Sequence, residues 1–351
     1  MSSVADKITG ILQEAVADGS ELGCQCAVWR DGSQIVDFSG GWCDSARTRP
    51  VNGGSLFPVF SAGKMLAGTA MLRGIALGRL ELHAPVSRLW TEFTGCGREE
   101  ITPAHILSHT TGLFCLPHAD SPEELTDWNL MCNRIAAMKP AWRPGSRTKY
   151  QALSYSWQTG RPLELAFGKS FSPLLQELVT GPAGISSDFF SGIPAGEEHR
   201  LVRLERAADL QPPLPVKQTF WNPTENMLRS AAVRRAALPA FNSLASARGM
   251  MGLGAALLNG LLPSEILAEA TLLQRPAGEA IPARPGYWEI FGYGFQLFGG
   301  PEKRGALYGH GGYGGAEIVI HPESRTVFAF TRNRLAEDKT IHQRIKEALG
   351  F

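Results

Sequence analysis

The chain has 351 residues, of which 44% are hydrophobic and 19% are charged, and its formal net charge at pH 7 is +1. This composition is typical of folded globular proteins and excludes an intrinsically disordered chain. The near-neutral charge argues against a nucleic acid or a membrane as the main partner, and we find no basic run, no apolar stretch of membrane-spanning length and no signal-peptide core.

The six cysteines are scattered through the first half of the chain and have neither the spacing of a metal site nor that of a redox pair. They are Cys24, Cys26, Cys43, Cys96, Cys115 and Cys132. We interpret them as reduced thiols rather than disulfides, and therefore expect a cytoplasmic protein.

A helix and a hairpin are predicted at the N-terminus. Apolar residues at helical spacing indicate a helix over residues 4–17. Two short runs at 24–29 and 35–38 have strand character, and Asp31 and Gly32 between them are a strong hairpin-turn signal.

Helical patterns dominate the middle of the chain, and strands return near its end. Helices are predicted over residues 66–77, 85–90, 101–109, 123–138, 155–181, 244–258 and 339–349. Strands are predicted over residues 293–298, 316–320 and 327–331. Residues 184–223 have a weak pattern, with Pro212, Pro213 and Pro215, and indicate long loops with some short strand.

These elements predict an α+β fold. One antiparallel sheet is expected from the N- and C-terminal segments, residues 1–60 and 285–351, flanked by their helices. Residues 61–284 are expected to form a mostly helical domain beside the sheet. The cleft between the two is the natural place for an active site.

The helix predicted from residue 66 begins beside a candidate nucleophile. Pro58 and the hydroxyl of Ser61 mark the start of this helix, and Lys64 follows Ser61 by three residues, so that both side chains share one face. A lysine amine whose pKa is lowered can take the proton of a serine alcohol. The alternative is an ordinary amphipathic helix start with a solvated lysine. The same spacing recurs at Ser146 and Lys149, but there no apolar helical run follows.

Two further stretches suit a serine acyl-transfer site. Tyr150 lies beside Lys149, and a phenol near lysine ammonium groups can be held closer to phenolate and act as a general base. Residues 308–315 contain five glycines, which leave backbone N–H groups accessible to a substrate, and His310 among them could donate a hydrogen bond to a substrate carbonyl or carboxylate. The alternatives are a half-buried aromatic residue and a tight turn between strands.

Two histidines, His105 and His109, have the helical spacing of a metal-binding pair, and His118 is the nearest third candidate. No acidic residue lies between the pair, and His118 follows a loop. We therefore expect structural hydrogen bonds rather than a metal site.

In combination these motifs resemble the serine β-lactamase and penicillin-binding-protein superfamily, and most closely the class C-like β-lactamases and the family VIII carboxylesterases. The resemblance rests on Ser61-x-x-Lys64, Leu107-Ser-His-Thr-Thr-Gly-Leu113, Tyr150-x-Ala152 and His310-Gly311-Gly312, and it covers nearly the whole chain. It implies a β-lactamase/transpeptidase-like fold.

The resemblance also implies roles for single residues. Ser61 is the nucleophile, Lys64 holds its proton balance, and Tyr150 is the general base. The backbone N–H groups of Ser61 and Tyr313 form the oxyanion hole, and His310, Gly311 and Gly312 bind the substrate. No metal or organic cofactor is implied, because lysine and tyrosine transfer the protons.

Departures from the β-lactamase pattern favour an esterase. Ala152 replaces an asparagine, and His310 and Gly311 replace a lysine and a threonine, so polar contacts to a β-lactam are lost. We expect a serine carboxylesterase acting on small esters of short or medium acyl chains. The alternatives are an acyltransferase that uses the same acyl-enzyme, a weak β-lactamase or D-aminopeptidase, and a non-catalytic binding module.

Overall fold

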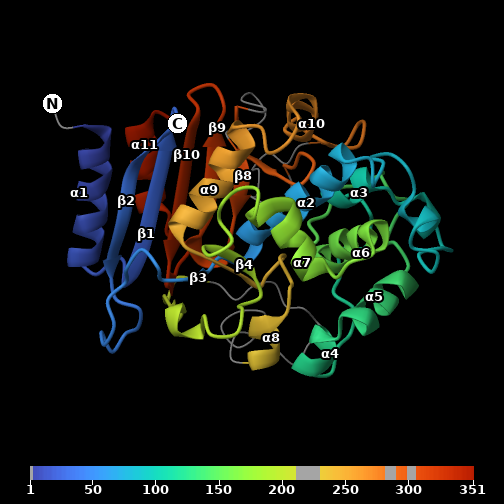
Figure 1. Ribbon diagram of the computed structural model, residues 1–351, viewed down its shortest axis with the longest axis horizontal. Helices are drawn as coiled ribbons and strands as arrows, with labels where there is room; N and C mark the ends of the chain where they lie inside the picture. Colours follow the sequence, from blue (N-terminus) through green and yellow to red (C-terminus); the bar gives the residue numbers. More distant parts are fainter. Residues whose placement is uncertain (1–2, 211–229, 281–289, 299–305) are drawn as a thin grey trace.

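The computed structural model describes residues 3–210, 230–280, 290–298 and 306–351. A sheet with its helices lies on one side of the molecule and a group of helices on the other, with helix α2 (Lys64–Ala76) between them (Figure 1). The two ends of the chain lie near each other beside the sheet. This is the α+β, β-lactamase/transpeptidase-like architecture that the sequence predicts.

The main sheet joins both ends of the chain, as predicted. Its strand order is β2-β1-β10-β9-β8-β7, and every neighbouring pair is antiparallel. The N-terminal hairpin meets the C-terminal strands where β1 pairs with β10, with Ala27 opposite Ala329. The strands are β1 (Gly23–Arg30), β2 (Ser33–Gly41), β7 (Gln296–Phe298), β8 (Leu307–Gly311), β9 (Glu317–His321) and β10 (Thr326–Arg332).

The predicted hairpin turn is confirmed. Asp31 and Gly32 both have positive φ, 46° and 90°, as a two-residue turn with the twist of its strands requires. The predicted first helix is α1 (Val4–Ala17), and the Ser3 side chain caps it by accepting from the Asp6 N–H.

Helices cover both faces of the sheet. Helices α1 and α11 (Thr340–Leu349) pack on one face, where Cys24 and Cys26 are buried with Phe328. Helix α9 (Ala247–Leu258) packs on the other face against β1, β9 and β10. The predicted helix over 244–258 begins later than expected because β6 (Ser243–Ala245) pairs with β3 (Phe57–Pro58) and β4 (Phe189–Ser191), and Ser246 then caps α9.

The helical half is more broken than the sequence predicts. In place of one helix over 123–138 there are two, because Asp127 is extended and its carboxylate accepts from the Leu130 N–H at the start of α5. The 155–181 pattern is interrupted at Gly168, which has a φ of 66°. Residues 85–90 form only a 3₁₀ turn at Val86–Arg88.

The remaining elements are short or belong to the helical half. The helices are α3 (Pro103–Leu107), α4 (Pro122–Thr126), α5 (Trp128–Ala137), α6 (Tyr155–Phe167), α7 (Phe171–Leu175), α8 (Ala231–Arg235) and α10 (Ser264–Ala270), with a π-helical turn at Gln176–Thr180. In the predicted loop region 184–223 the structure has β4 and β5 (Glu205–Arg206), and β5 pairs with β11 (Arg334–Leu335). Residues 211–223 of that region lie outside the described residues.

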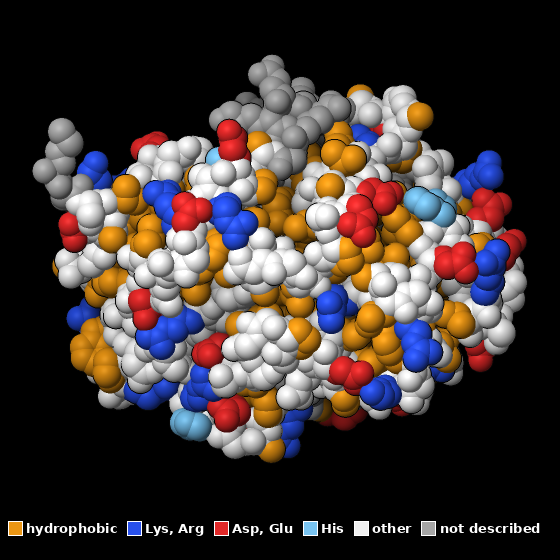
Figure 2. Space-filling model, turned by 45° about the horizontal axis from the view of Figure 1, so that its top comes forward, with side chains coloured by type: hydrophobic (Ala, Val, Ile, Leu, Met, Phe, Trp, Pro, Cys, Tyr) orange, Lys and Arg blue, Asp and Glu red, His pale blue; other side chains and the backbone are white. Residues whose placement is uncertain are grey.

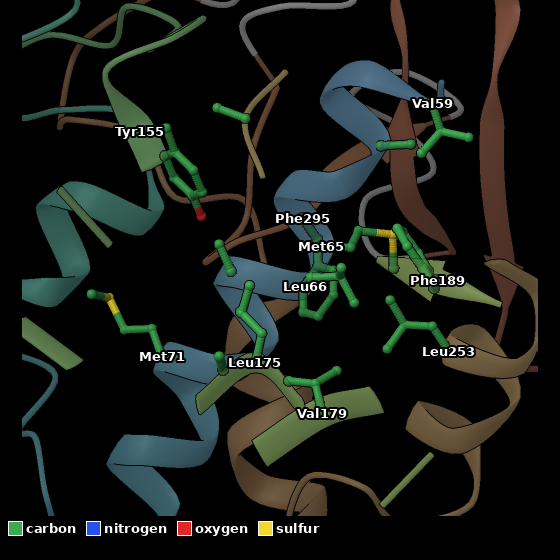
Figure 3. Close-up of a cluster of buried hydrophobic side chains, with 14 of the residues drawn as sticks. Val59, Met65, Leu66, Met71, Tyr155, Leu175, Val179, Phe189, Leu253 and Phe295 are labelled. Atoms are coloured by element: carbon green, nitrogen blue, oxygen red, sulfur yellow. The ribbon is translucent and has the colours of Figure 1, made fainter. Parts of the chain in front are cut away.

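Helix α2 runs through the centre of the core. Its residues 64–72 and 74 are buried, so apolar contacts surround it rather than line one face. Met65, Leu66 and Met71 lie among side chains from several other elements (Figure 3). Since both halves of the molecule pack on this helix, its first turn is held in place from all sides.

The surface carries charges of both signs. Figure 2 shows a face on which Lys and Arg side chains are interspersed with Asp and Glu, in keeping with the net charge of +1. In the described parts of the chain, no helix is both long and apolar enough to cross a membrane.

Candidate active site

Ser61 lies in a tight turn that leads from β3 into α2. The turn is a 3₁₀ helix over Phe60–Gly63, and Phe60 before the serine has a left-handed φ of 46°. A Cβ on Gly63 would overlap the Ser243 side chain, so the turn packs directly on the start of β6. Ser61 does not cap α2 as predicted, because Gly63 holds that position. The Ser61 hydroxyl instead lies 3.2 Å from the Ala240 carbonyl oxygen.

Lys64 is buried beside Ser61. Its Nζ lies 3.1 Å from Ser61 Oγ, 2.8 Å from the Ala152 carbonyl oxygen and 2.9 Å from the Ala240 carbonyl oxygen. The side chain is only 1% exposed, which rules out the solvated-lysine alternative, and burial lowers its pKa well below the usual value.

The three neighbours of Lys64 Nζ indicate what a neutral amine does here. A neutral amine has two N–H donors and one lone pair, and a backbone carbonyl can only accept. In its neutral form Lys64 can give both N–H groups to the carbonyls of Ala152 and Ala240, and its lone pair then faces Ser61 Oγ. Lys64 is thus arranged to accept the Ser61 proton.

Tyr150 lies beside Ser61 and Lys64, and its protonation state differs from the one predicted. Its ring centroid lies 4.6 Å from Lys64 Nζ. Burial raises the pKa of Tyr150, although a side-chain hydrogen bond with Ser61 opposes the shift. The expected shift toward phenolate needs a nearby cation, but burial also lowers the pKa of Lys64 and so disfavours its charged form. Burial thus favours a phenol and a neutral amine in the resting pair.

The turn after β8 lies against the Ser61 turn. A Cβ on Gly312 would overlap the Val59 carbonyl oxygen, and the rings of Phe60 and Tyr313 are 5.6 Å apart, edge to face. The glycine-rich stretch is thus neither all loop nor a simple hairpin turn. It begins as strand β8 and continues as a 3₁₀ turn at Tyr313–Gly315.

The end of β8 is less fully paired than its start. Its pairing with β9 continues to Gly311, but its pairing with β7 stops at Gly309. The Gly311 N–H donates instead to Gln296 Oε1, at 3.0 Å. Gly311, Gly312 and Tyr313 are partly exposed.

His310 is buried, and its polarity differs from the prediction. Its Nδ1 lies 2.6 Å from the Gly311 carbonyl oxygen, so Nδ1 carries the proton and donates. Burial is the main cause that lowers its pKa to about 3, so the ring is neutral at pH 7. Nε2 is then an acceptor, whereas the sequence suggested a donor to a substrate carbonyl or carboxylate.

The other candidate residues have separate structural partners. His105 Nδ1 accepts from the Thr102 N–H at the start of α3, and His118 Nε2 lies 2.6 Å from Asp120 Oδ1. His109 is buried and bonds Gln151, at 3.0 Å. The hydrogen-bonding roles predicted for these histidines are confirmed. Residues 146–149 are not helical, so the second Ser-x-x-Lys copy lacks the frame of the first.

Sequence reasoning missed the two carbonyls that hold Lys64. Ala152 was noted only for the amide that its side chain lacks, and Ala240 was not considered. Every residue has a backbone carbonyl, so no residue type marks these two in the sequence. Tyr155 was also missed as a site residue. Its ring lies 5.9 Å from Lys64 Nζ, and Figure 3 shows it at the start of α6 with its hydroxyl toward α2.

Known proteins resemble the chain over almost its full length. A family model described as Beta-lactamase matches residues 8–349. An esterase/beta-lactamase named LipL, from Mycobacterium tuberculosis, is 26% identical over 336 residues, which cover 88% of this chain and 76% of LipL. Esterase EstB from Burkholderia gladioli is 30% identical over 202 residues, 52% of this chain and 51% of EstB.

A solved structure shows the same fold. The crystal structure of a family VIII carboxylesterase superimposes with a TM-score of 0.87 at 24% sequence identity. The match covers 99% of this chain and 97% of that chain.

Proposed function

The chain belongs to the β-lactamase family, and on this premise we propose that it is a serine carboxylesterase that forms an acyl-enzyme on Ser61. The observation that carries the proposal is the buried Lys64 amine, whose N–H groups face two carbonyls while Ser61 Oγ lies 3.1 Å away. The esterase names of LipL and EstB support an ester-hydrolysing activity.

Acylation begins at the Ser61–Lys64 pair. Neutral Lys64 takes the Ser61 proton as Oγ attacks the ester carbonyl carbon. The negative charge that develops on the carbonyl oxygen is stabilised by the backbone N–H groups of Ser61 and Tyr313, which come from two turns in contact. Lys64 thereby acts as the base toward Ser61, a part that the family resemblance gives to Tyr150.

Tyr150 protonates the leaving group and then takes part in deacylation. Its phenol proton passes to the departing alkoxide oxygen, and the ammonium of Lys64 then restores the phenol. In deacylation the same pair takes a proton from water, the resulting hydroxide attacks the acyl carbon, and Ser61 recovers its proton. No charge is left on the enzyme at the end of the cycle.

The substrate is proposed to be an uncharged ester of a short or medium acyl chain, lying along His310, Gly311 and Gly312. Neutral His310 provides no cation for a carboxylate, and Ala152 provides no side-chain amide. We also retain the proposals of a sheet domain (1–60 and 285–351) beside a helical domain (61–284), and of a cytoplasmic protein without nucleic-acid or membrane partners.

The proposal is tested with p-nitrophenyl acetate, butyrate and decanoate on wild type, Ser61→Ala and Ser146→Ala. We expect the highest kcat/KM on acetate or butyrate, no enzymatic rate for Ser61→Ala, and wild-type rates for Ser146→Ala, which alters the second Ser-x-x-Lys copy. Unchanged hydrolysis by Ser61→Ala would refute the nucleophile. A preference for decanoate would refute the proposed chain length.

A further inference from the structure

Both sequence neighbours of Tyr150 form hydrogen bonds with His109. The Lys149 N–H donates to the His109 carbonyl oxygen at 2.9 Å. On the other side, His109 Nδ1 lies 3.0 Å from Gln151 Oε1. Between these two bonds, the imidazole packs edge to face on the Tyr150 ring with 4.9 Å between centroids. The position of Tyr150 therefore depends on one residue that is distant in the sequence.

A chain of buried amides fixes the orientation of Gln151 against His109. Gln158 Nε2 donates to the Leu113 carbonyl oxygen, which can only accept, so the Gln158 oxygen must face Gln151. Gln151 therefore presents Nε2 to Gln158, at 2.7 Å, and its oxygen to His109. His109 Nδ1 lies 3.0 Å from this oxygen and 3.3 Å from the backbone nitrogen of Gln151, so both the side chain and the main chain of Gln151 hold the imidazole.

The backbone of His109 also has an unusual conformation. Its φ is 60°, in the left-handed region where, apart from glycine, asparagine, aspartate and histidine are the enriched residues. The ring lies 4.4 Å from that of Phe291, and Tyr150 stacks on the same Phe291 at 5.5 Å. His109 is buried, and burial is the main cause that lowers its pKa well below the usual value, so that the ring stays neutral.

We propose that His109, held by Gln151 and Gln158, is a positioning residue that keeps Tyr150 against Ser61 and Lys64. The proposal rests on the role given to Tyr150 in the proposed function. His109 acts through Tyr150 and takes no proton from the reacting groups. The hydrogen bonding of its Nδ1 to Gln151 and its left-handed backbone are the two properties that the role requires.

These two properties allow a rescue test. Asparagine at position 109 keeps the left-handed backbone and places a side-chain amide near the position of Nδ1, whereas alanine loses the hydrogen-bonding group and the ring. Esterase kcat is measured per active site, counted by fluorophosphonate titration, so that loss of folded protein does not enter the rate. We expect His109→Ala to lower kcat by about 10- to 100-fold with little change in KM, and His109→Asn to recover most of it.

A double-variant cycle with Tyr150→Phe separates positioning from general support. If His109 acts through Tyr150, His109→Ala costs less than about 2-fold in the Tyr150→Phe background, because its target is already lost. An equal loss in both backgrounds, or His109→Asn as slow as His109→Ala, would overturn the proposal. Full activity of Tyr150→Phe would refute the role of Tyr150 itself and the His109 proposal with it, while Ser61 labelling would persist.

Discussion

Gly312 packs so closely on Val59 that no side chain fits between the turn after β8 and the turn that carries Ser61. The two turns come from opposite ends of the sequence, and each supplies one of the two N–H groups proposed for the oxyanion hole. Their contact therefore sets the distance between these donors.

Gly312→Ala should separate the two turns. The added Cβ would overlap the Val59 carbonyl oxygen, so the turn must shift and the donors lose their common target. Loss of one oxyanion-hole donor costs about 10²- to 10³-fold in kcat, and we expect a loss of this order for p-nitrophenyl butyrate. The matched control is Gly10→Ala in α1, where a Cβ meets nothing within 4 Å. Equal rates for both variants would contradict the proposed hole.

The pH dependence of the esterase should have an acid limb that belongs to Lys64. Lys64 works as a neutral amine, and burial lowers its pKa, so kcat/KM rises with pH as Lys64 loses its proton and then levels off. The His310 imidazole titrates at about 3 and does not contribute to this limb near neutral pH. Lys64→Met should abolish the activity. An acid limb that persists unchanged in His310→Asn would assign it to Lys64, and a limb that disappears in His310→Asn would contradict this assignment.

The same lowered pKa predicts a stability signature. In the folded protein Lys64 is neutral at pH values where the unfolded chain still binds its proton, so the unfolded state binds more protons and stability rises with pH. The free energy of unfolding of wild type should therefore increase relative to Lys64→Met, by up to about 1.4 kcal/mol per pH unit, as the pH rises toward the unfolded pKa. Urea unfolding at several pH values measures this difference, and a constant difference would show a charged Lys64.

Much of the fold and part of this site could be predicted from the sequence. Which features could be predicted and which could not has physical causes. The helix at 4–17 and the turn at Asp31 and Gly32 are set by local spacing and turn chemistry. Ser61 and Lys64 share a face for the same local reason. The helix break at Asp127 escaped prediction because a capping carboxylate competes there with a continuous apolar pattern.

The protonation states could not be predicted because they depend on packing between distant segments. Burial lowers the pKa of Lys64, and the carbonyls that accept its N–H groups belong to residues 88 and 176 positions away in the sequence. His310 becomes an acceptor because Nδ1 is bonded to the adjacent Gly311 carbonyl, a choice of tautomer that residue type leaves open. The expectation that Tyr150 approaches phenolate failed for the same reason.

The core around α2 should be sensitive to truncation. Met71 is fully buried, and a buried Met→Ala change costs about 2–5 kcal/mol through lost transfer energy and the cavity left behind. Leu77, at the end of the same helix, is 54% exposed, and Leu77→Ala should change stability by no more than about 0.5 kcal/mol. Chemical unfolding of the two variants measures both values. Similar costs would mean that α2 is not buried as described.

The charge of the substrate should determine which of two esters of similar size the enzyme hydrolyses faster. Three basic groups of the site, Lys64, His109 and His310, lie around Tyr150, and each has a lowered pKa. A carboxylate on the acyl chain would lose water without gaining a cation. We expect kcat/KM for p-nitrophenyl butyrate to exceed that for the p-nitrophenyl half-ester of succinate by at least about 10-fold, which is 1.4 kcal/mol. Preference for the half-ester would indicate a cation at the site.

The central claim is that Ser61 is the nucleophile, and intact mass after incubation with a fluorophosphonate tests it most directly. Wild type and Ser146→Ala should each gain the mass of one phosphonyl group, and Ser61→Ala should gain none. An adduct that persists in Ser61→Ala, or that disappears in Ser146→Ala, would contradict the account and place the nucleophile elsewhere.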